Sequence, residues 1–253
     1  MQLIYSRRQA PWNRFVTPQP GGFKNIYSRQ LYQNEIFSKQ KIYMFFDRIH
    51  AGEVLAAELT KFRDDPGVVL AVPRGGIPIA YVVAKTLDWP LDLLLTKKIG
   101  HPLNEEYAIG SVSLTDRLII PHEGVSQSYI DQETHRIRYR LREMHKKFMG
   151  DEEPVSIKDK TVIVVDDGMA TGNTLMSTIS MLRQSEPAKI IVAVPVASRS
   201  AFKKISELVD EIICPLVPEH FAGVGAFYEN FQQVNDEEAM YYLDKMRGLK
   251  KAG

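Results

Sequence analysis

The chain has 253 residues, of which 44% are hydrophobic and 25% are charged, and its formal net charge at pH 7 is +1. This length and composition are typical of a folded protein with one sizeable core, and they exclude a largely disordered chain. The near-zero charge excludes a strong overall field toward nucleic acid or membrane. Cys214 is the only cysteine, so the chain has no internal disulfide, which fits a reducing compartment.

The most apolar stretch, residues 68–84, contains Arg74 and two prolines. These interruptions argue against a membrane-spanning helix. The amino-terminal residues also lack the apolar core of a signal peptide. We therefore expect a soluble, cytoplasmic protein.

Residues 1–41 differ in composition from the rest of the chain. They carry seven basic side chains against one acid, Glu35, and the basic residues alternate with aromatic ones. Prolines and glycines in this stretch argue against a long regular element. A basic, aromatic segment could bind single-stranded nucleic acid, but no known RNA-binding motif accompanies it. We expect an arm that packs on the body or on a second subunit, or a partly ordered tail, with residues 42–253 as the main domain.

After the arm, helical periodicity alternates with short, continuously apolar runs that are rich in β-branched residues. Residues 108–114 and 117–121 are weaker strand candidates that could form a hairpin around Thr115–Asp116, and Asn235 or Asp236 is a suitable N-cap for the last helix. The cations of residues 127–149 are expected on a solvated helix face. The expected strands are 67–72, 91–96, 161–165, 189–197 and 211–217, and the expected helices are 51–62, 77–88, 126–149, 173–184, 200–209 and 235–249.

Strands without polar alternation that are separated by helices predict an α/β fold, in which a parallel sheet has helices on both faces. Ligands of such folds bind outside the carboxyl ends of the strands. Three stretches with polar side chains lie at these ends. We therefore take them as candidate binding segments.

The first of these stretches is VIVVDDGMATGNT, Val162–Thr174. A buried strand ends in Asp166 and Asp167, and a turn of small residues then leads into a helix. The amides of such a turn and of the helix start can hold a phosphate group. Two acids would repel that phosphate, so we expect them to accept hydrogen bonds from a polyhydroxylated group attached to it, such as a ribose.

The second and third stretches are VPRGG, residues 72–76, and TKKIG, residues 96–100. Arg74 follows a buried strand and offers paired N–H groups to an anion. Gly75 and Gly76 would allow backbone amides to come close to anionic oxygens. Adjacent side chains of a strand point in opposite directions, so only one of Lys97 and Lys98 is expected to face the site. Residues 101–110 would then form a mobile segment over it.

The stretch Val162–Thr174 resembles the phosphoribosyl diphosphate (PRPP) motif of the type I phosphoribosyltransferases. Four further segments, FFDRIHAGEVLAAEL, VLAVPRGGIPIA, LLLTKKIGHPLNEEYAIGSV and FAGVGAFYENFQQVNDEEA, are similar in order to a subfamily of predicted phosphoribosyltransferases. The resemblance covers Phe45 to about Met240. It implies a Rossmann-like core of the phosphoribosyltransferase type with a small cap or hood, built from residues 1–41 and 221–231, and a homodimer.

The resemblance also implies a role for each motif. Lys97 or Lys98 would act with Arg74 in catalysis by neutralising the departing pyrophosphate, and Phe227 or Tyr228 could stack on a base or pack in the core. Mg²⁺ would be bound with PRPP and without a direct protein ligand, touching Asp166 and Asp167 through water. Ribose would be held by Asp166 and Asp167, pyrophosphate by Arg74, Gly75 and Gly76, and the 5′-phosphate by Met169, Ala170, Thr171, Gly172, Asn173 and Thr174.

The function that follows is transfer of the phosphoribosyl group from PRPP to a nitrogenous acceptor, with a nucleobase as the first expectation, and release of pyrophosphate. Such a transferase would act in nucleotide metabolism. Ala170 stands where the 6-oxopurine salvage enzymes have an acid, which weakens a hypoxanthine or guanine assignment. The alternative is a non-catalytic regulator of the same fold that senses PRPP or a nucleotide and could bind RNA.

Overall fold

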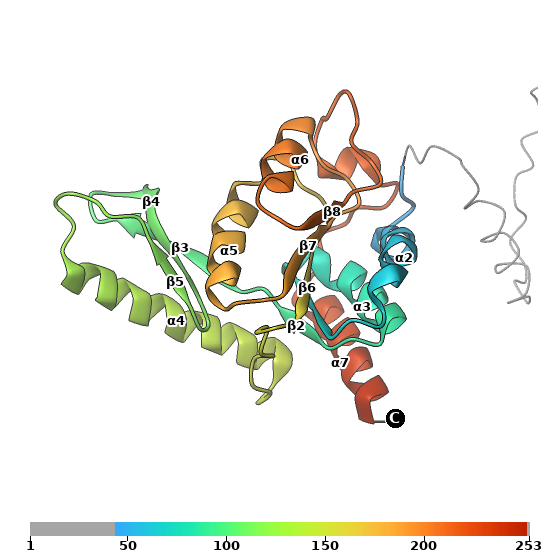
Figure 1. Ribbon diagram of the computed structural model, residues 1–253, viewed down its shortest axis with the longest axis horizontal. Helices are drawn as coiled ribbons and strands as arrows, with labels where there is room; N and C mark the ends of the chain where they lie inside the picture. Colours follow the sequence, from blue (N-terminus) through green and yellow to red (C-terminus); the bar gives the residue numbers. More distant parts are fainter. Residues whose placement is uncertain (1–43, 252–253) are drawn as a thin grey trace, which may run out of the picture. The chain divides into compact units, whose positions relative to one another are not determined.

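The structure is a computed structural model that describes residues 44–251 (Figure 1). The arm of residues 1–41 lies outside the described residues. Five parallel strands form the central sheet in the order β2-β1-β6-β7-β8, which confirms the predicted α/β fold. Their bounds are Leu91–Leu93 for β2, Gly67–Ala71 for β1, Thr161–Val165 for β6, Lys189–Ala193 for β7 and Glu211–Ile213 for β8.

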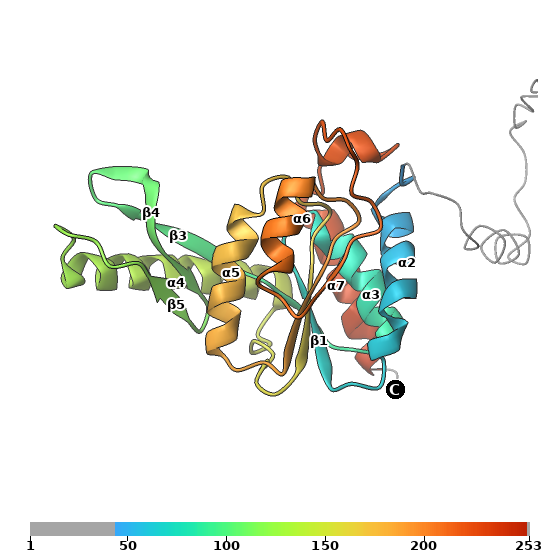
Figure 2. The ribbon, with the colours of Figure 1, turned by 45° about the horizontal axis from the view of Figure 1, so that its top comes forward.

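The strands are apolar throughout because helices cover both faces of the sheet. Alternate residues of one strand enter different cores: Val69 packs in the cluster of α2, α3 and α7, whereas Val68 packs in the cluster of α5 and α6. Figures 1 and 2 show α2, α3 and α7 on one side of the sheet and α5 and α6 on the opposite side. The helices span Arg48–Leu59 (α2), Gly76–Leu87 (α3), Asp236–Lys251 (α7), Asn173–Gln184 (α5) and Arg199–Ser206 (α6).

Three strands end three or four residues earlier than the sequence predicts. The run 91–96 leaves the central sheet after Leu93, because the chain there passes to a second sheet that begins at Thr96. The runs 189–197 and 211–217 both contain a proline, Pro195 and Pro215, near the end of the observed strand. Proline has no amide hydrogen and therefore cannot continue the ladder of a central strand.

The second sheet is antiparallel and has the order β3-β4-β5, with bounds Thr96–His101, Asn104–Ser113 and Arg117–Ile119. The predicted hairpin around Thr115–Asp116 is confirmed, since β4 pairs with β5 across it. Residues 101–110, expected as a mobile segment, form most of the β3–β4 hairpin, and their mobility stays a prediction. The side chains of residues 104–108 are exposed, so their pairing depends on backbone hydrogen bonds and leaves no apolar signal in the sequence.

Helix α4, Gln127–Met149, packs along the second sheet (Figure 2). Ser126 caps its start, since its Oγ accepts a hydrogen bond from the amide of Tyr129 at 3.2 Å. The apolar side of α4 carries Ile137 and Leu141, which pack in the larger core, and most of its arginines are exposed as predicted. Within residues 44–251, no helix is both long and apolar enough to cross a membrane.

One buried polar cluster fastens α4 to the edge of the central sheet. Asp92 of β2 is 3% exposed, and its carboxylate lies 3.0 Å from Nε2 of His145 on α4. The same carboxylate accepts hydrogen bonds from the amides of Leu93 at 2.7 Å and Val155 at 2.8 Å. This carboxylate therefore contacts two buried groups and one partly buried amide, from three different segments.

We expect Asp92→Ala to lower the free energy of unfolding by about 3 kcal/mol, because it leaves these buried and partly buried groups without a partner. Urea denaturation measures the change. The control is Asp151→Ala. Asp151 pairs with Lys146, and the side chain of Asp151 is 88% exposed, so this substitution should leave stability nearly unchanged. Equal effects of the two substitutions would contradict the role given to Asp92.

Candidate functional site

A cleft of about 1060 Å³ lies at the carboxyl ends of the central strands. Residues 72–75 follow β1, and Asp167 follows β6. Residues 94–97 comprise the connection from β2 to β3 and the first two residues of β3. Parts of α4 and of residues 224–236 complete the walls. The cleft thus joins all three candidate segments from the sequence, at the edge of the sheet where ligands of such folds bind.

The two acids after β6 are held in a partly buried position where charge is unfavourable. Oδ1 of Asp166 accepts a hydrogen bond from the amide of Asp167 at 2.8 Å. Burial, together with the neighbouring carboxylate of Asp167, raises the pKa of Asp166 to about 8. Burial also raises the pKa of Asp167, although a hydrogen bond from Arg48 opposes this shift. Hydroxyl groups of a ligand could lower the cost of ionising both acids by donating hydrogen bonds to them.

Asp167 also fixes the distance between the loops after β1 and β6. A Cβ atom at Gly75 would lie 2.0 Å from Oδ2 of Asp167. Only glycine therefore allows the loop after β1 to pass beside this carboxylate. On the other side, the hydroxyl of Tyr228 donates a hydrogen bond to the backbone oxygen of Asp167 at 2.7 Å.

Arg48 is a residue of this site that the sequence analysis did not identify. Its Nε and Nη2 atoms donate to Oδ2 of Asp167 at 3.0 and 2.9 Å, and Nη1 donates to the backbone oxygen of Gln232 at 2.7 Å. The guanidinium group also lies 4.0 Å from the centre of the Phe231 ring. A cation in the first turn of a helix is unfavourable toward the helix dipole, and Arg48 is the first residue of α2, so its position was an available signal.

Hydrogen bonds to Val196 and Ser198 hold the candidate 5′-phosphate loop in place. Met169 is buried, its amide donates to the backbone oxygen of Val196 at 2.9 Å, and Ser198 Oγ donates to the backbone oxygen of Ala170 at 2.7 Å. Gly172 has φ +72° and precedes α5 as its N-cap without a side chain to cap the helix. The first amides of α5 are therefore left for solvent or an anion. Thr171, Asn173 and Thr174 are exposed around this helix start.

The candidate pyrophosphate loop follows β1. The peptide bond between Pro73 and Arg74 is cis. A Cβ atom at Gly76 would lie 2.5 Å from the backbone oxygen of Val165, so the loop packs directly on the end of β6. The Nε atom of Arg74 lies 2.6 Å from Oδ1 of Asp236, the first residue of α7. Arg74 is thus in the cleft, paired with an acid of the protein.

The structure distinguishes the two lysines of β3. Lys97 lines the cleft. Lys98 instead donates from Nζ to Oε2 of Glu106 at 2.8 Å, and its side chain is 45% exposed. The expectation that one of the two faces the site fits this arrangement, and Lys98 is removed from the candidate catalytic residues because its ammonium group is paired outside the cleft.

The two aromatic candidates for base stacking also require correction. Tyr228 is 5% exposed, and its ring packs between Phe45 at 5.5 Å and Phe231 at 4.8 Å, measured between ring centres. Phe227 stacks on Phe221 at 5.6 Å and is not among the residues that line the cleft. Among the described residues, the phenylalanines that line it are Phe148 and Phe231. Tyr228 is therefore a support for Asp167 rather than a stacking surface.

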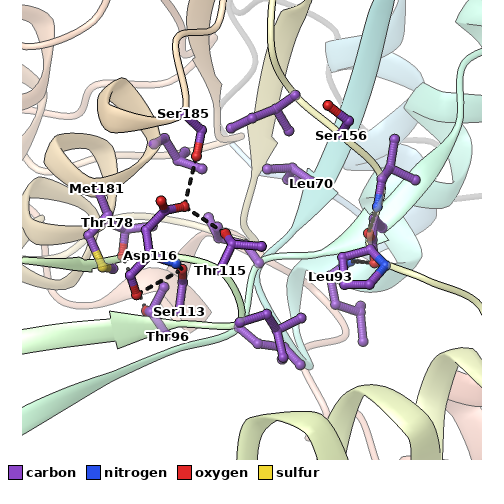
Figure 3. A pocket seen from close by; sticks show the side chains of 18 of the residues that line it. Leu70, Leu93, Thr96, Ser113, Thr115, Asp116, Ser156, Thr178, Met181 and Ser185 are labelled. Atoms are coloured by element: carbon purple, nitrogen blue, oxygen red, sulfur yellow. Dashed lines mark hydrogen bonds between the residues drawn. The ribbon is translucent and has the colours of Figure 1, made fainter. Parts of the chain in front are cut away.

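A second cavity, of about 300 Å³, lies on the α5 side of the central sheet (Figure 3). Apolar residues such as Leu70 and Met181 line it, together with the β4–β5 turn. In this turn the carboxylate of Asp116 accepts hydrogen bonds from Thr115 Oγ1 at 2.6 Å and Ser185 Oγ at 2.7 Å. Of the site residues predicted from the sequence, none lines this cavity, so the cleft remains the candidate site.

Comparisons with known proteins found similar sequences and structures. The crystal structure of TT1426 from Thermus thermophilus has 36% sequence identity and a TM-score of 0.71, and the match covers 80% of this chain and 99% of that chain. A Mycobacterium tuberculosis protein that is named as a candidate phosphoribosyl transferase is 31% identical over 216 residues, which are 83% of this chain and 49% of the relative. The chain therefore spans about half the length of that relative.

A uracil phosphoribosyltransferase of Mycoplasma genitalium is 28% identical over 139 residues, which are 54% of this chain and 61% of that protein. The sequence model of the family described as phosphoribosyl transferase domain matches residues 34–232, which contain the loops after β1, β3 and β6. The chain belongs to the phosphoribosyl transferase domain family.

Proposed function

We propose that this chain binds PRPP in the cleft and transfers its phosphoribosyl group to a nitrogenous acceptor, with release of pyrophosphate. The observation that carries the proposal is the pair of partly buried acids, Asp166 and Asp167, which lies between two turns suited to anions. One turn is the uncapped start of α5, and the other contains Arg74. A sugar that has a phosphate at one end and a diphosphate at the other would offer hydroxyl groups to the acids and an anion to each turn.

The proposed reaction requires no covalent bond to the protein. An acceptor nitrogen attacks C1 of the ribose while the bond from C1 to the pyrophosphate oxygen breaks, and the electron pair leaves with pyrophosphate. The protein holds the donor by its two anionic ends, which places C1 for attack. Arg74 and Lys97 stabilise the charge that develops on the leaving group.

Mg²⁺ is part of the proposal because it would add positive charge beside the leaving pyrophosphate. Among residues 44–251, no three histidine, cysteine or acidic side chains converge as a metal site. The residues therefore fit an ion that is bound mainly through the oxygens of PRPP. Asp166 and Asp167 would touch it through water.

We expect PRPP to bind to the wild-type protein, and the double variant Asp166→Asn with Asp167→Asn to lose that binding. The amide side chains keep an oxygen for the amide of Asp167 and for Arg48, so the fold should persist. Isothermal titration calorimetry with PRPP and Mg²⁺ measures affinity, and circular dichroism verifies folding. Wild-type affinity in the folded double variant would show that these acids are not the ribose site.

Lys97→Gln should lower the rate of pyrophosphate release by about 10²-fold, which is the effect typical of losing one well-placed charge contact. Lys98→Gln is the matched control and should retain the wild-type rate, because Lys98 is paired with Glu106 outside the cleft. The assay measures pyrophosphate from PRPP with a panel of purines, pyrimidines and other nitrogen acceptors. Release with none of them, despite PRPP binding, would instead favour a regulator that senses PRPP.

The raised pKa of Asp166 predicts how stability depends on pH. Between the ordinary value of 3.8 and about 8, the folded protein holds a proton on Asp166 that the unfolded chain has lost. Stability should therefore fall as pH rises through this range, by at most about 1.4 kcal/mol per pH unit. Asp166→Asn should remove this slope and be more stable than wild type near pH 8. Parallel pH profiles from urea denaturation of the two proteins would contradict the assignment.

A further inference from the structure

Asp236 occupies an unusual position at the start of α7. The helix is already capped by Asn235, whose Oδ1 accepts a hydrogen bond from the amide of Glu238 at 2.8 Å. The carboxylate of Asp236 is therefore not needed as a cap. It contacts two cations instead, with Oδ1 2.6 Å from Nε of Arg74 and Oδ2 2.5 Å from Nζ of Lys147.

The two cations come from distant parts of the chain. Arg74 follows β1 in the candidate pyrophosphate loop, and Lys147 belongs to the last turn of α4. Both line the cleft, together with Lys97 and Asp236. Because one carboxylate bridges them, Arg74 and Lys147 lie close enough for a single larger anion to contact both.

Lys147 differs in this respect from its neighbour on α4. The ammonium group of Lys146 pairs with Asp151 at 3.0 Å, its side chain is 69% exposed, and it does not line the cleft. The cations of α4 were expected to form a solvated face, and Lys146 fits that expectation. Lys147 is exposed as well, but its side chain lines the cleft.

The contact between Asp236 and Arg74 is one that a bound anion could replace. Oδ1 of Asp236 is shielded from solvent and makes no well-aligned hydrogen bond within the described residues, although Nε of Arg74 is close. The side chains of Arg74 and Lys147 remain 44% and 54% exposed. A diphosphate has more charge and more acceptor oxygens than one carboxylate, and so can satisfy both cations better.

We propose that Lys147 is a pyrophosphate-binding residue, and that the carboxylate of Asp236 holds Lys147 and Arg74 in place until the diphosphate of PRPP replaces it. This inference rests on the proposed function and deepens it. Lys147 attracts the diphosphate, whereas Asp236 competes with it for the same cations. The two residues therefore have opposite effects on binding, although they form one ion pair.

The test is calorimetric titration with inorganic pyrophosphate and Mg²⁺ of the wild-type chain, Lys147→Gln, Asp236→Asn and the matched control Lys146→Gln. Loss of a charged contact should weaken pyrophosphate binding by about tenfold in Lys147→Gln. Removal of the competing charge should tighten binding by about threefold in Asp236→Asn. Lys146→Gln should bind as the wild type does.

Ribose 5-phosphate provides the second readout, because it would occupy the α5 end of the cleft and not contact Lys147. Its affinity should be the same in all four proteins. If the ion pair only supported the fold, both Lys147→Gln and Asp236→Asn would weaken binding of both ligands, and this result would overturn the proposal. Wild-type pyrophosphate affinity in Lys147→Gln, or weaker affinity in Asp236→Asn, would also overturn it.

The same titrations separate this inference from the proposed function. A wild-type protein that binds PRPP, together with a Lys147→Gln variant of unchanged pyrophosphate affinity, would reject the role of Lys147 alone. A wild-type protein that binds neither PRPP nor pyrophosphate would reject the proposed function, and this inference with it.

Discussion

The parallel pairing of β1 with β6 determines where the two central candidate binding loops lie. The pairing places Ala71 beside Val165, so the chain leaves both strands at the same level of the sheet. The loop with Arg74 and the loop with Asp166 and Asp167 therefore begin side by side. Their contact is close enough that the position of Gly75 excludes any side chain. In a parallel sheet this edge is the one place where several loops can meet around a ligand.

The cleft combines opposite charges that stabilise one another without a ligand. Arg48 is paired with Asp167, and Asp236 is paired with Arg74 and Lys147. Asp166 has no such cation at hydrogen-bond distance among the described side chains, and burial correspondingly raises its pKa to about 8. The arrangement keeps groups of both signs close together at the carboxyl ends of β1 and β6. It also costs stability, as binding sites built from buried charge commonly do.

The sequence predicted the central sheet well because its strands are buried on both faces and their helices have clear periodicity. It failed for residues 104–108, whose exposed side chains give no pattern for the hairpin they form. The acids and glycines of the site were predicted because they directly follow strands. Lys147 and Asp236 were missed because they lie on helices, where the sequence does not distinguish a charge that enters the cleft from one in solvent. Arg48 was missed although its place in the first turn of α2 was an available signal. The pattern of aromatic residues near glycines likewise did not reveal which rings are buried and which line the cleft. Tyr228 is buried, whereas Phe231 lines the cleft. The acceptor, the homodimer and the role of residues 1–41 stay predictions.

The short connection Leu94–Leu95 has a consequence for how the molecule responds to a ligand. It is one of the places where the parallel and antiparallel sheets join. The cleft takes Lys97 and Lys147 from the antiparallel sheet and its covering helix, and takes Arg74 and Asp167 from the parallel sheet. An anion bound by both groups acts as a crosslink between the two layers. The free energy of ligand binding would then add to the free energy needed to separate the β3–β5 sheet from the core. The bound ligand would therefore hold the two sheets together.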